Sequence, residues 1–304
     1  MTQIVVGVDN TEAHRPVLGM LERLDFPEPH ITLIHVAAER MPFAPTFGDV
    51  EAIEDRYATV TANLGRAALH KATTLASSKD LPSDAQMVRG NAAECLIREA
   101  EARKVDLIAV NAKNPGGPQA GMMGSVGRAL AIGSQTSVLF ARDQARHETF
   151  QAVYATDHSP FAARCLDRFL ELAPKGIKDI HVLSAWEIDD REAELLGTNL
   201  AMMGGDADRW IEEALEEKNL AMCKRLEEAG YQTHSMVRRG KPGDVIRQAM
   251  ADVAADLLIV GSQGRGAMDR AWIGSVSLRQ ATAESYPVLI VRPKEAGTRP
   301  VFLS

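Results

Sequence analysis

A run rich in glycine and serine in the second half of the chain has the composition of an anion-binding loop. It reads Gly261-Ser262-Gln263-Gly264-Arg265-Gly266 and, after nine intervening residues counted from Gly264, continues as Gly274-Ser275-Val276-Ser277. Glycine lets a backbone approach a ligand closely, and successive N–H groups can form a concave anion site. Gly274-Ser275 is expected to open a helix, whose free N–H groups and dipole favour phosphate, and serine hydroxyls can add donors. The candidate binding residues of this run are Gly261, Ser262, Gly264, Arg265, Gly266, Gly274, Ser275, Val276 and Ser277, with the phosphates expected on 264–266 and 274–277.

A carboxylate is expected across the crevice from this loop. The apolar run at residues 151–155 is followed directly by Thr156 and Asp157. If that run is a parallel strand, Asp157 lies at its carboxyl end, where open α/β sheets bind ligands and where acidic side chains accept hydrogen bonds from ribose. We therefore add Ala155, Thr156 and Asp157 to the candidate site. The alternative is that Asp157 only caps the turn that follows it.

The elements that must position these residues occur twice along the chain. Residues 106–142 and 256–292 align without a gap, with 11 of 37 positions identical, whereas ordinary composition gives about one in sixteen by chance. In both copies short, continuously apolar runs alternate with amphipathic segments, which is typical of a parallel sheet covered by helices on both faces. We predict an α/β fold of two tandem Rossmann-like domains, residues 1–146 and 147–304, joined through the polar segment 143–149.

The glycine spacing, followed by the run PVLIVR at residues 287–292, resembles the ATP-binding signature of the universal stress protein family. Asp157 resembles the adenosine-contacting Asp of that family. His181-Val182 resembles its H-V ending of the second strand, where the backbone of Val182 would contact adenine, and Gly240-Lys241-Pro242 resembles its G-x-P turn. The resemblance implies an adenine nucleotide alpha hydrolase-like fold, with a five-stranded parallel sheet of order 3-2-1-4-5 in each half and pairing of the halves through their fifth strands. It also implies ATP in the second half, with Mg²⁺ as a candidate companion of its phosphates.

The first half departs from this pattern. Asn111 and Asn114 replace the first two glycines, Pro115 removes a backbone N–H, and Gly127 replaces the second serine. The positions that remain are Asp9, Val36, Gly124 and Ser125. We therefore predict that the first half holds a weaker second site.

Other function classes remain open at this stage. A glycine loop between a strand and a helix can serve packing alone, so the chain could be a nucleotide-independent interaction scaffold, or a slow ATP hydrolase. The chain has no G-x4-G-K-[ST] loop, no G-x-S-x-G elbow and no G-x-G-x-x-G after the first strand, which disfavours P-loop, α/β-hydrolase and NAD chemistry. Asp157-His158-Ser159 is contiguous, whereas a catalytic triad is defined by geometry in space. We assign no catalytic residue and no metal ligand, and prefer a nucleotide-binding regulatory protein whose protein partner is unknown.

Composition limits the classes of partner and the cellular location that we expect for the protein. The net charge of −7 argues against a general nucleic-acid or anionic-membrane surface. The three cysteines form no C-x-x-C pair and are expected to be reduced. The chain has no apolar run of ~18–20 residues and no signal-peptide pattern at its start. We expect a soluble cytoplasmic protein, and the sequence leaves open whether two chains form a homodimer.

Overall fold

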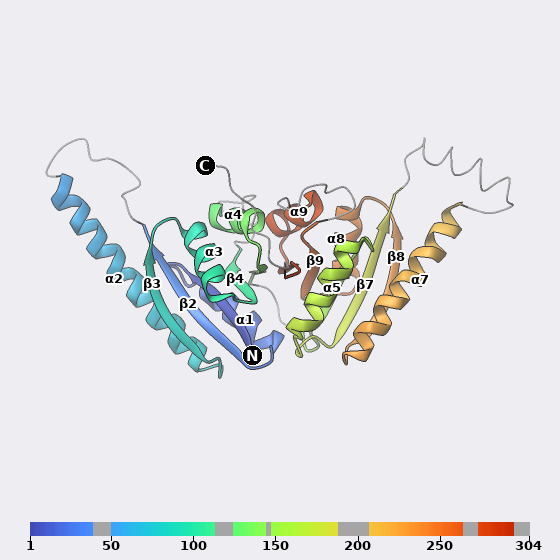
Figure 1. The fold of residues 1–304 in the computed structure, drawn as a ribbon, viewed down its shortest axis with the longest axis horizontal. Helices are drawn as coiled ribbons and strands as arrows, with labels where there is room; N and C mark the ends of the chain where they lie inside the picture. Colours follow the sequence, from blue (N-terminus) through green and yellow to red (C-terminus); the bar gives the residue numbers. More distant parts are fainter. Residues whose placement is uncertain (39–49, 113–123, 144–146, 188–206, 264–272, 295–304) are drawn as a thin grey trace.

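The computed structural model describes residues 1–38, 50–112, 124–143, 147–187, 207–263 and 273–294. Strands and helices alternate in the same order in two halves (Figure 1). The first half contains β1 (Thr2–Val8), α1 (His14–Leu24), β2 (Pro29–Ala37), α2 (Val50–Ser77), β3 (Ser83–Arg89), α3 (Ala92–Arg103), β4 (Leu107–Asn111), α4 (Ser125–Gly133) and β5 (Ser137–Ala141). The second contains β6 (Gln151–Ala155), α5 (Pro160–Leu172), β7 (Asp179–Trp186), α7 (Ala207–Glu228), β8 (Gln232–Arg239), α8 (Pro242–Asp252), β9 (Leu257–Gly261), α9 (Ser275–Ala283) and β10 (Val288–Val291).

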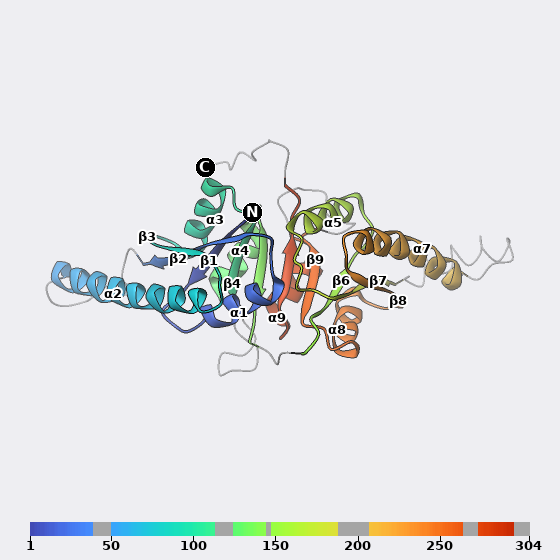
Figure 2. The ribbon, with the colours of Figure 1, turned by 90° about the horizontal axis from the view of Figure 1, so that it is seen from below.

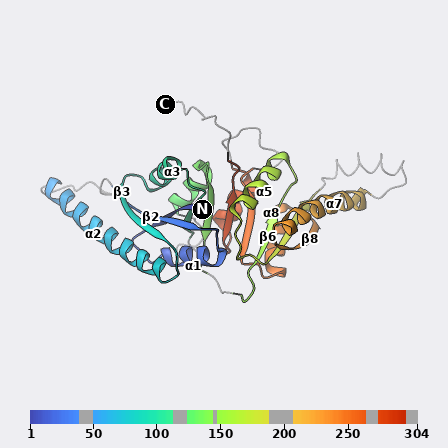
Figure 3. The same ribbon diagram turned by 60° about the horizontal axis from the view of Figure 1, so that its bottom comes forward.

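All ten strands belong to one sheet. Its order is β3-β2-β1-β4-β5-β10-β9-β6-β7-β8, so each half has the expected order 3-2-1-4-5. Neighbouring strands within a half are parallel, whereas β5 and β10 pair antiparallel, with Leu139 opposite Leu289. The predicted α/β fold and the predicted pairing of the fifth strands are therefore confirmed. The long helices α2 and α7 lie at the two outer ends of the molecule (Figures 1 and 3).

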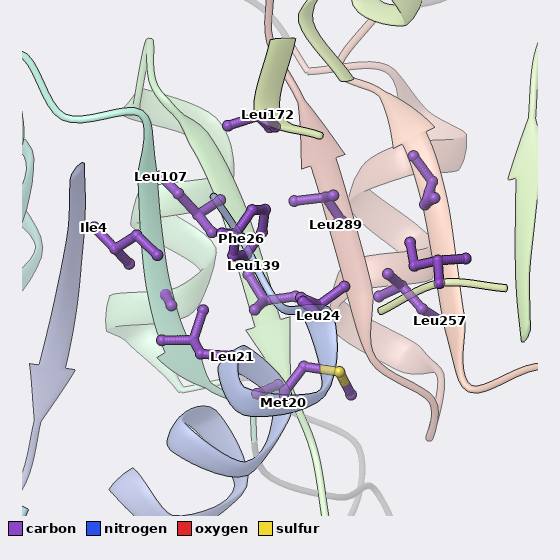
Figure 4. Close-up of a cluster of buried hydrophobic side chains, with 14 of the residues drawn as sticks. Ile4, Met20, Leu21, Leu24, Phe26, Leu107, Leu139, Leu172, Leu257 and Leu289 are labelled. Carbon is purple, nitrogen blue, oxygen red and sulfur yellow. The ribbon is translucent and has the colours of Figure 1, made fainter. Parts of the chain in front are cut away.

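Helices cover both faces of the sheet, which explains the continuously apolar strands. One buried cluster includes side chains of α1, α2, α5 and α7, and the other includes side chains of α3, α4, α8 and α9. Both clusters continue from one half into the other. The two halves, similar in form, lie on either side of the central strands (Figure 2). Figure 4 shows the first cluster where the halves meet, with Leu24, Leu139, Leu172 and Leu289 among its members.

Ion pairs also join the halves, among them those of Arg168 and Arg23. Arg168 of α5 donates to Asp106 Oδ1 at 2.7 Å, and Arg23 of α1 donates to Asp256 Oδ1 at 3.0 Å. Burial alone would raise the pKa of Asp106, but hydrogen bonds from Arg168 and from the backbone N–H of Gln3 lower it overall. Removing one partner of a buried pair leaves an uncompensated charge, at a cost of about 3–5 kcal/mol. The halves are therefore joined by charge as well as by apolar packing.

Helix α5 begins at Ser159-Pro160, residue types that favour the start of a helix. Ser159 is the N-cap, and its side chain accepts a hydrogen bond from Ala162 N at 3.1 Å, while Pro160 occupies the first turn. Such a cap satisfies one of the free N–H groups of a helix N-terminus. Because α5 starts immediately after β6 and Asp157, this cap fixes the chain at the carboxyl end of the first strand of the second half.

Candidate functional site

A cavity of about 920 Å³ lies at the carboxyl ends of β6, β7 and β9 in the second half. Of the residues predicted from sequence, those lining it are Ala155, Thr156, Asp157, Gly261, Gly274, Ser275, Val276 and Ser277. Segments more than one hundred residues apart in the chain thus meet around one space, as the topology of an open parallel sheet predicts.

Asp157 lies in the turn between β6 and α5 and has a structural role there. Its Oδ1 accepts a hydrogen bond from Ser159 N at 3.0 Å, and Asp9 Oδ1 makes the same bond with Thr11 N at 2.9 Å in the first half. The turn-forming alternative is therefore observed in both halves. In the second half the same side chain also lines the cavity.

The N-terminus of α9 opens onto this cavity. No described side chain caps it, unlike α3 and α5, whose N-caps Asn91 and Ser159 bond to backbone N–H groups. Gly274 N donates to Ser262 O at 2.6 Å, which holds the start of the helix against the end of β9. The first turn of a helix presents N–H groups that have no partner within the helix, so this end is suited to an anion.

Two serines of the loop have roles that differ from the prediction. Ser277 Oγ donates to Gly261 O at 2.6 Å, so its proton fixes the loop rather than facing an anion. Ser262 is buried, and its N–H donates to Val291 O at 3.3 Å. The side chain of Ser277 and the backbone of Ser262 thus hold the ends of the loop in place.

A side chain at residue 261, where β9 ends, would crowd Cys165. A Cβ atom there would lie 3.1 Å from Cys165 Sγ, tighter than ordinary van der Waals contact. Burial raises the pKa of Cys165 to about 12, so this cavity-lining thiol is protonated at neutral pH and is not a reactive thiolate. The predicted contacts Gly264, Arg265 and Gly266 lie outside the described residues.

The prediction that His181-Val182 forms the ending of the second strand of this half is wrong, because β7 continues to Trp186. In the first half Gly7 pairs with Ile34, and in the second Ala155 pairs with Leu183. His35 lies opposite Met87, as Ser184 lies opposite Val237. Strand register therefore makes Ser184 and Ala185 the counterparts of His35 and Val36. Val182 is fully buried, whereas Leu183, Ser184, Ala185 and Trp186 line the cavity.

A buried polar cluster beside the cavity was missed by the sequence analysis. His158 Nε2 lies 2.9 Å from both Ser184 Oγ and Asn219 Oδ1, and Ser184 Oγ donates to Asn219 Oδ1 at 2.7 Å. The Asn219 amide in turn donates to Val182 O and Met236 O. This is not a serine triad, because the Ser184 proton points at Asn219 and both partners meet the same imidazole nitrogen. The cluster holds the end of β7 against α7.

The wall of the cavity between β7, α7 and α8 is apolar and aromatic. Trp186, Trp210, Leu215 and Ile246 contribute to it. Arg239 lies over the Trp186 ring at 5.1 Å from its centroid, a cation–π contact that fixes the indole. An apolar and aromatic wall in the same cavity as a helix N-terminus suits a ligand with an aromatic ring at one end and negative charge at the other.

The corresponding positions of the first half are arranged differently. Gly124 is the N-cap of α4 with nearly the same backbone angles as Gly274, and Ser125 begins that helix as Ser275 begins α9. The His35 imidazole bonds to Val8 O at 2.8 Å, and a Cβ on Gly65 would lie 2.3 Å from its ring. The His35 ring therefore occupies the space above Gly65, beside the candidate positions Asp9 and Val36.

Within the described ranges, no group of three or more His, Cys, Asp or Glu side chains is placed to hold a metal ion. None of the described helices has both the length and the apolar character needed to cross a membrane.

Comparison with known proteins gives one consistent family. The model of the universal stress protein family matches residues 1–142 and 150–292. A universal stress protein of Mycolicibacterium smegmatis is 25% identical over 313 residues, covering 96% of this chain and 97% of that protein. Universal stress protein YxiE of Bacillus subtilis is 28% identical over 145 residues, covering 45% of this chain and 95% of its own length. The crystal structure of a universal stress protein from Archaeoglobus fulgidus has a TM-score of 0.66 at 18% identity, over 96% of this chain and 98% of that one, and this likeness shows the fold.

Proposed function

Because the chain belongs to the universal stress protein family, we propose that its second half binds an adenine nucleotide such as ATP and that occupancy regulates contact with a protein partner. The observation that carries the proposal is one cavity that joins Asp157, the N-terminus of α9 and the apolar wall at the end of β7. Each supplies one kind of contact that a nucleotide needs.

The proposed pose follows from the chemistry of each wall. The phosphates would lie at Gly274 to Val276, where helix N–H groups and the helix dipole favour negative charge. The ribose would lie near Asp157, whose carboxylate accepts hydrogen bonds from hydroxyl groups. The adenine would lie against the apolar wall formed by Leu183 to Trp186 and by Ile246. Mg²⁺ would accompany the phosphates, since it is commonly held by phosphates and water with few protein ligands.

We propose a binding site rather than a catalytic one. His158, the histidine beside the cavity, has its Nε2 within 2.9 Å of both Ser184 and Asn219. A general base must be able to take a proton from the attacking group. An imidazole held inside a buried network is suited to positioning β7 and α7 instead.

Calorimetric titration of nucleotide-free protein with ATP and Mg²⁺ tests the proposal, using Gly274→Asp and the matched control Gly124→Asp. Both glycines are helix N-caps with φ of −61° and −53°, values open to any residue, and aspartate is a favourable N-cap. The carboxylate of Gly274→Asp would occupy the anion position, so ATP affinity should fall more than about tenfold. Gly124→Asp, which alters only the weaker site predicted in the first half, should leave the tighter binding in the second half unchanged.

The outcomes separate the candidate functions. About one equivalent of ATP, lost only in Gly274→Asp, supports the second half as the competent site. The absence of heat and of thermal stabilisation by ATP would contradict the proposal and favour a nucleotide-independent scaffold. ADP release above that of Gly274→Asp would favour the slow hydrolase.

A further inference from the structure

Two arginines cross between the halves at the carboxyl ends of the central strands. Arg142 follows β5 and Arg292 follows β10, the two strands that pair antiparallel at the middle of the sheet. Arg142 is 2% exposed. Burial lowers the pKa of each guanidinium to about 10, so both remain charged at neutral pH.

The Arg142 side chain reaches from the first half to the last helix of the second. Its Nη1 donates to Tyr286 O at 2.7 Å, and its Nη2 donates to Ala281 O. Ala281 lies in the last turn of α9, where carbonyl groups have no partner within the helix. A cation at this end also complements the negative end of the helix dipole. Arg142 is therefore a C-terminal cap of α9.

Helix α9 has no basic residue of its own in its last turn. The capping charge thus comes from the first half. The other end of the same helix is the candidate phosphate site, and Ser277 ties that end to Gly261 of β9. A nine-residue helix is about 13 Å long and moves as a rigid unit. A shift at Ala281 therefore changes where Gly274 to Ser277 lie.

We propose that Arg142 is a positioning residue for the phosphate end of the nucleotide site, so that the second half needs the first in order to bind. The inference rests on the proposed function and deepens it. It also gives the first half a role in binding that does not depend on its own degenerate loop. Arg142 would contact no ligand and would act through α9.

Arg292 provides a matched control within the chain. It makes the reciprocal contacts, donating to Ser134 O and Ala131 O at the end of α4, and Ala131 and Ala281 occupy equivalent positions of the repeat. Helix α4 also lacks a basic residue in its last turn. Because α4 starts at the degenerate motif of the first half, loss of the Arg292 cap should weaken the fold without weakening ATP binding.

The test compares Arg142→Gln and Arg292→Gln in the full chain, with ATP and adenosine titrated against each. Both variants should lose a similar amount of thermal stability, since each leaves two carbonyl groups without their charged donor. For Arg142→Gln, ATP affinity should fall about tenfold while adenosine affinity changes less than about twofold, because only the phosphates would meet α9. For Arg292→Gln, both affinities should stay within about twofold of those of the unchanged chain.

The results that overturn the inference differ from those that overturn the proposed function. Equal loss of ATP affinity in both variants, or loss of ATP and adenosine together in Arg142→Gln, would show that the arginines only hold the fold. Absence of ATP binding by the unchanged chain would overturn the proposed function and this inference with it. If Arg142→Gln does not fold, the pair Arg142→Lys and Arg292→Lys makes the same comparison, because lysine keeps the charge but loses the two-pronged donor geometry.

Discussion

The ends of β2 and β7 occupy equivalent places in the two halves, but the large and the small side chains are exchanged between the strand and the helix that faces it. On β2 the large polar side chain is His35, and the facing helix α2 offers Gly65 and Leu69. On β7 the equivalent strand residue is the small Ser184, and α7 offers the larger Leu215 and the polar Asn219. The equivalence of the helices follows from their ends, where Leu81 bonds to Ala76 as Tyr231 bonds to Leu226.

The two halves therefore differ together at three neighbouring positions, one on the strand (His35 or Ser184) and two on the helix (Gly65 or Leu215, and Leu69 or Asn219). A close-packed core has little spare volume, so a smaller strand residue requires a larger helix residue. The same constraint holds for polarity, because a buried hydroxyl or imidazole needs a partner. In the second half the result is a cavity bordered by Ser184 and Leu215. In the first half the imidazole ring lies over Gly65 instead.

The largest expected effect is that of Asn219→Leu, which places the Leu69 side chain of the first half into the second. The change removes the carboxamide that bonds to Ser184, His158 and the carbonyl groups of Val182 and Met236, so that this buried cluster loses hydrogen bonds and retains the contact between Ser184 and His158. We expect a loss of about 2–3 kcal/mol in the free energy of unfolding, measured by urea denaturation. The reciprocal control, Leu69→Asn, should also destabilise, because it buries a carboxamide in an apolar cluster. If either substitution is tolerated without loss, the positions do not act as a set.

A smaller effect on the free energy of unfolding is expected at Gly65, where alanine should destabilise the protein when residue 35 is histidine but not when it is serine. Alanine favours helix over glycine by up to ~1 kcal/mol, but at residue 65 its Cβ would lie 2.3 Å from the His35 ring. Gly65→Ala should therefore lower the free energy of unfolding by about 1 kcal/mol or more. In a His35→Ser background, which copies Ser184, the same substitution should become neutral or stabilising. A double-mutant cycle by urea denaturation measures this coupling, and additive effects would show that the two residues do not constrain each other.

The sequence predicted the fold because its signals are local and repeated. Buried parallel strands are continuously apolar, and the identities between residues 106–142 and 256–292 fixed the equivalence of β4 with β9 and of β5 with β10. The N-cap Ser159 and the cavity residues Asp157 and Gly274 were also predictable, since turn and helix-start chemistry is readable from a few adjacent residues.

The prediction failed where the equivalence depended on register. Asp9 corresponds to Asp157 and His35 to Ser184, but the offset between the halves grows along the chain, because the segment before β7 is longer than the one before β2. The shared letters His-Val therefore led to Val182 in place of Ala185. The cluster of His158, Ser184 and Asn219 carried no sequence signal, because its members come from a turn, a strand and a helix far apart in the chain.

The smallest expected effect is on the pH dependence of stability. It concerns His181 of β7, whose counterpart on β2 is Thr32, which does not titrate. His181 stacks on His234 at 4.8 Å between ring centroids and lies 3.2 Å from Gln151 Oε1. Burial, and secondly the neighbouring His234, lower the pKa of His181 below 6.5. The unfolded chain therefore takes up this proton at a higher pH than the folded chain. The contribution of neutral His181 to the free energy of unfolding is fully present above about pH 6.5 and is lost as pH falls through the folded pKa.

His181→Thr should remove this loss, so that the variant becomes more stable relative to the unchanged chain as pH falls from 7.5 to 5.5, measured by urea denaturation. The gain should be well below the ~1.4 kcal/mol of a full pKa unit, because the ring is partly exposed to solvent. The other histidines are common to both proteins, so parallel stability curves would show that His181 is not the group that titrates.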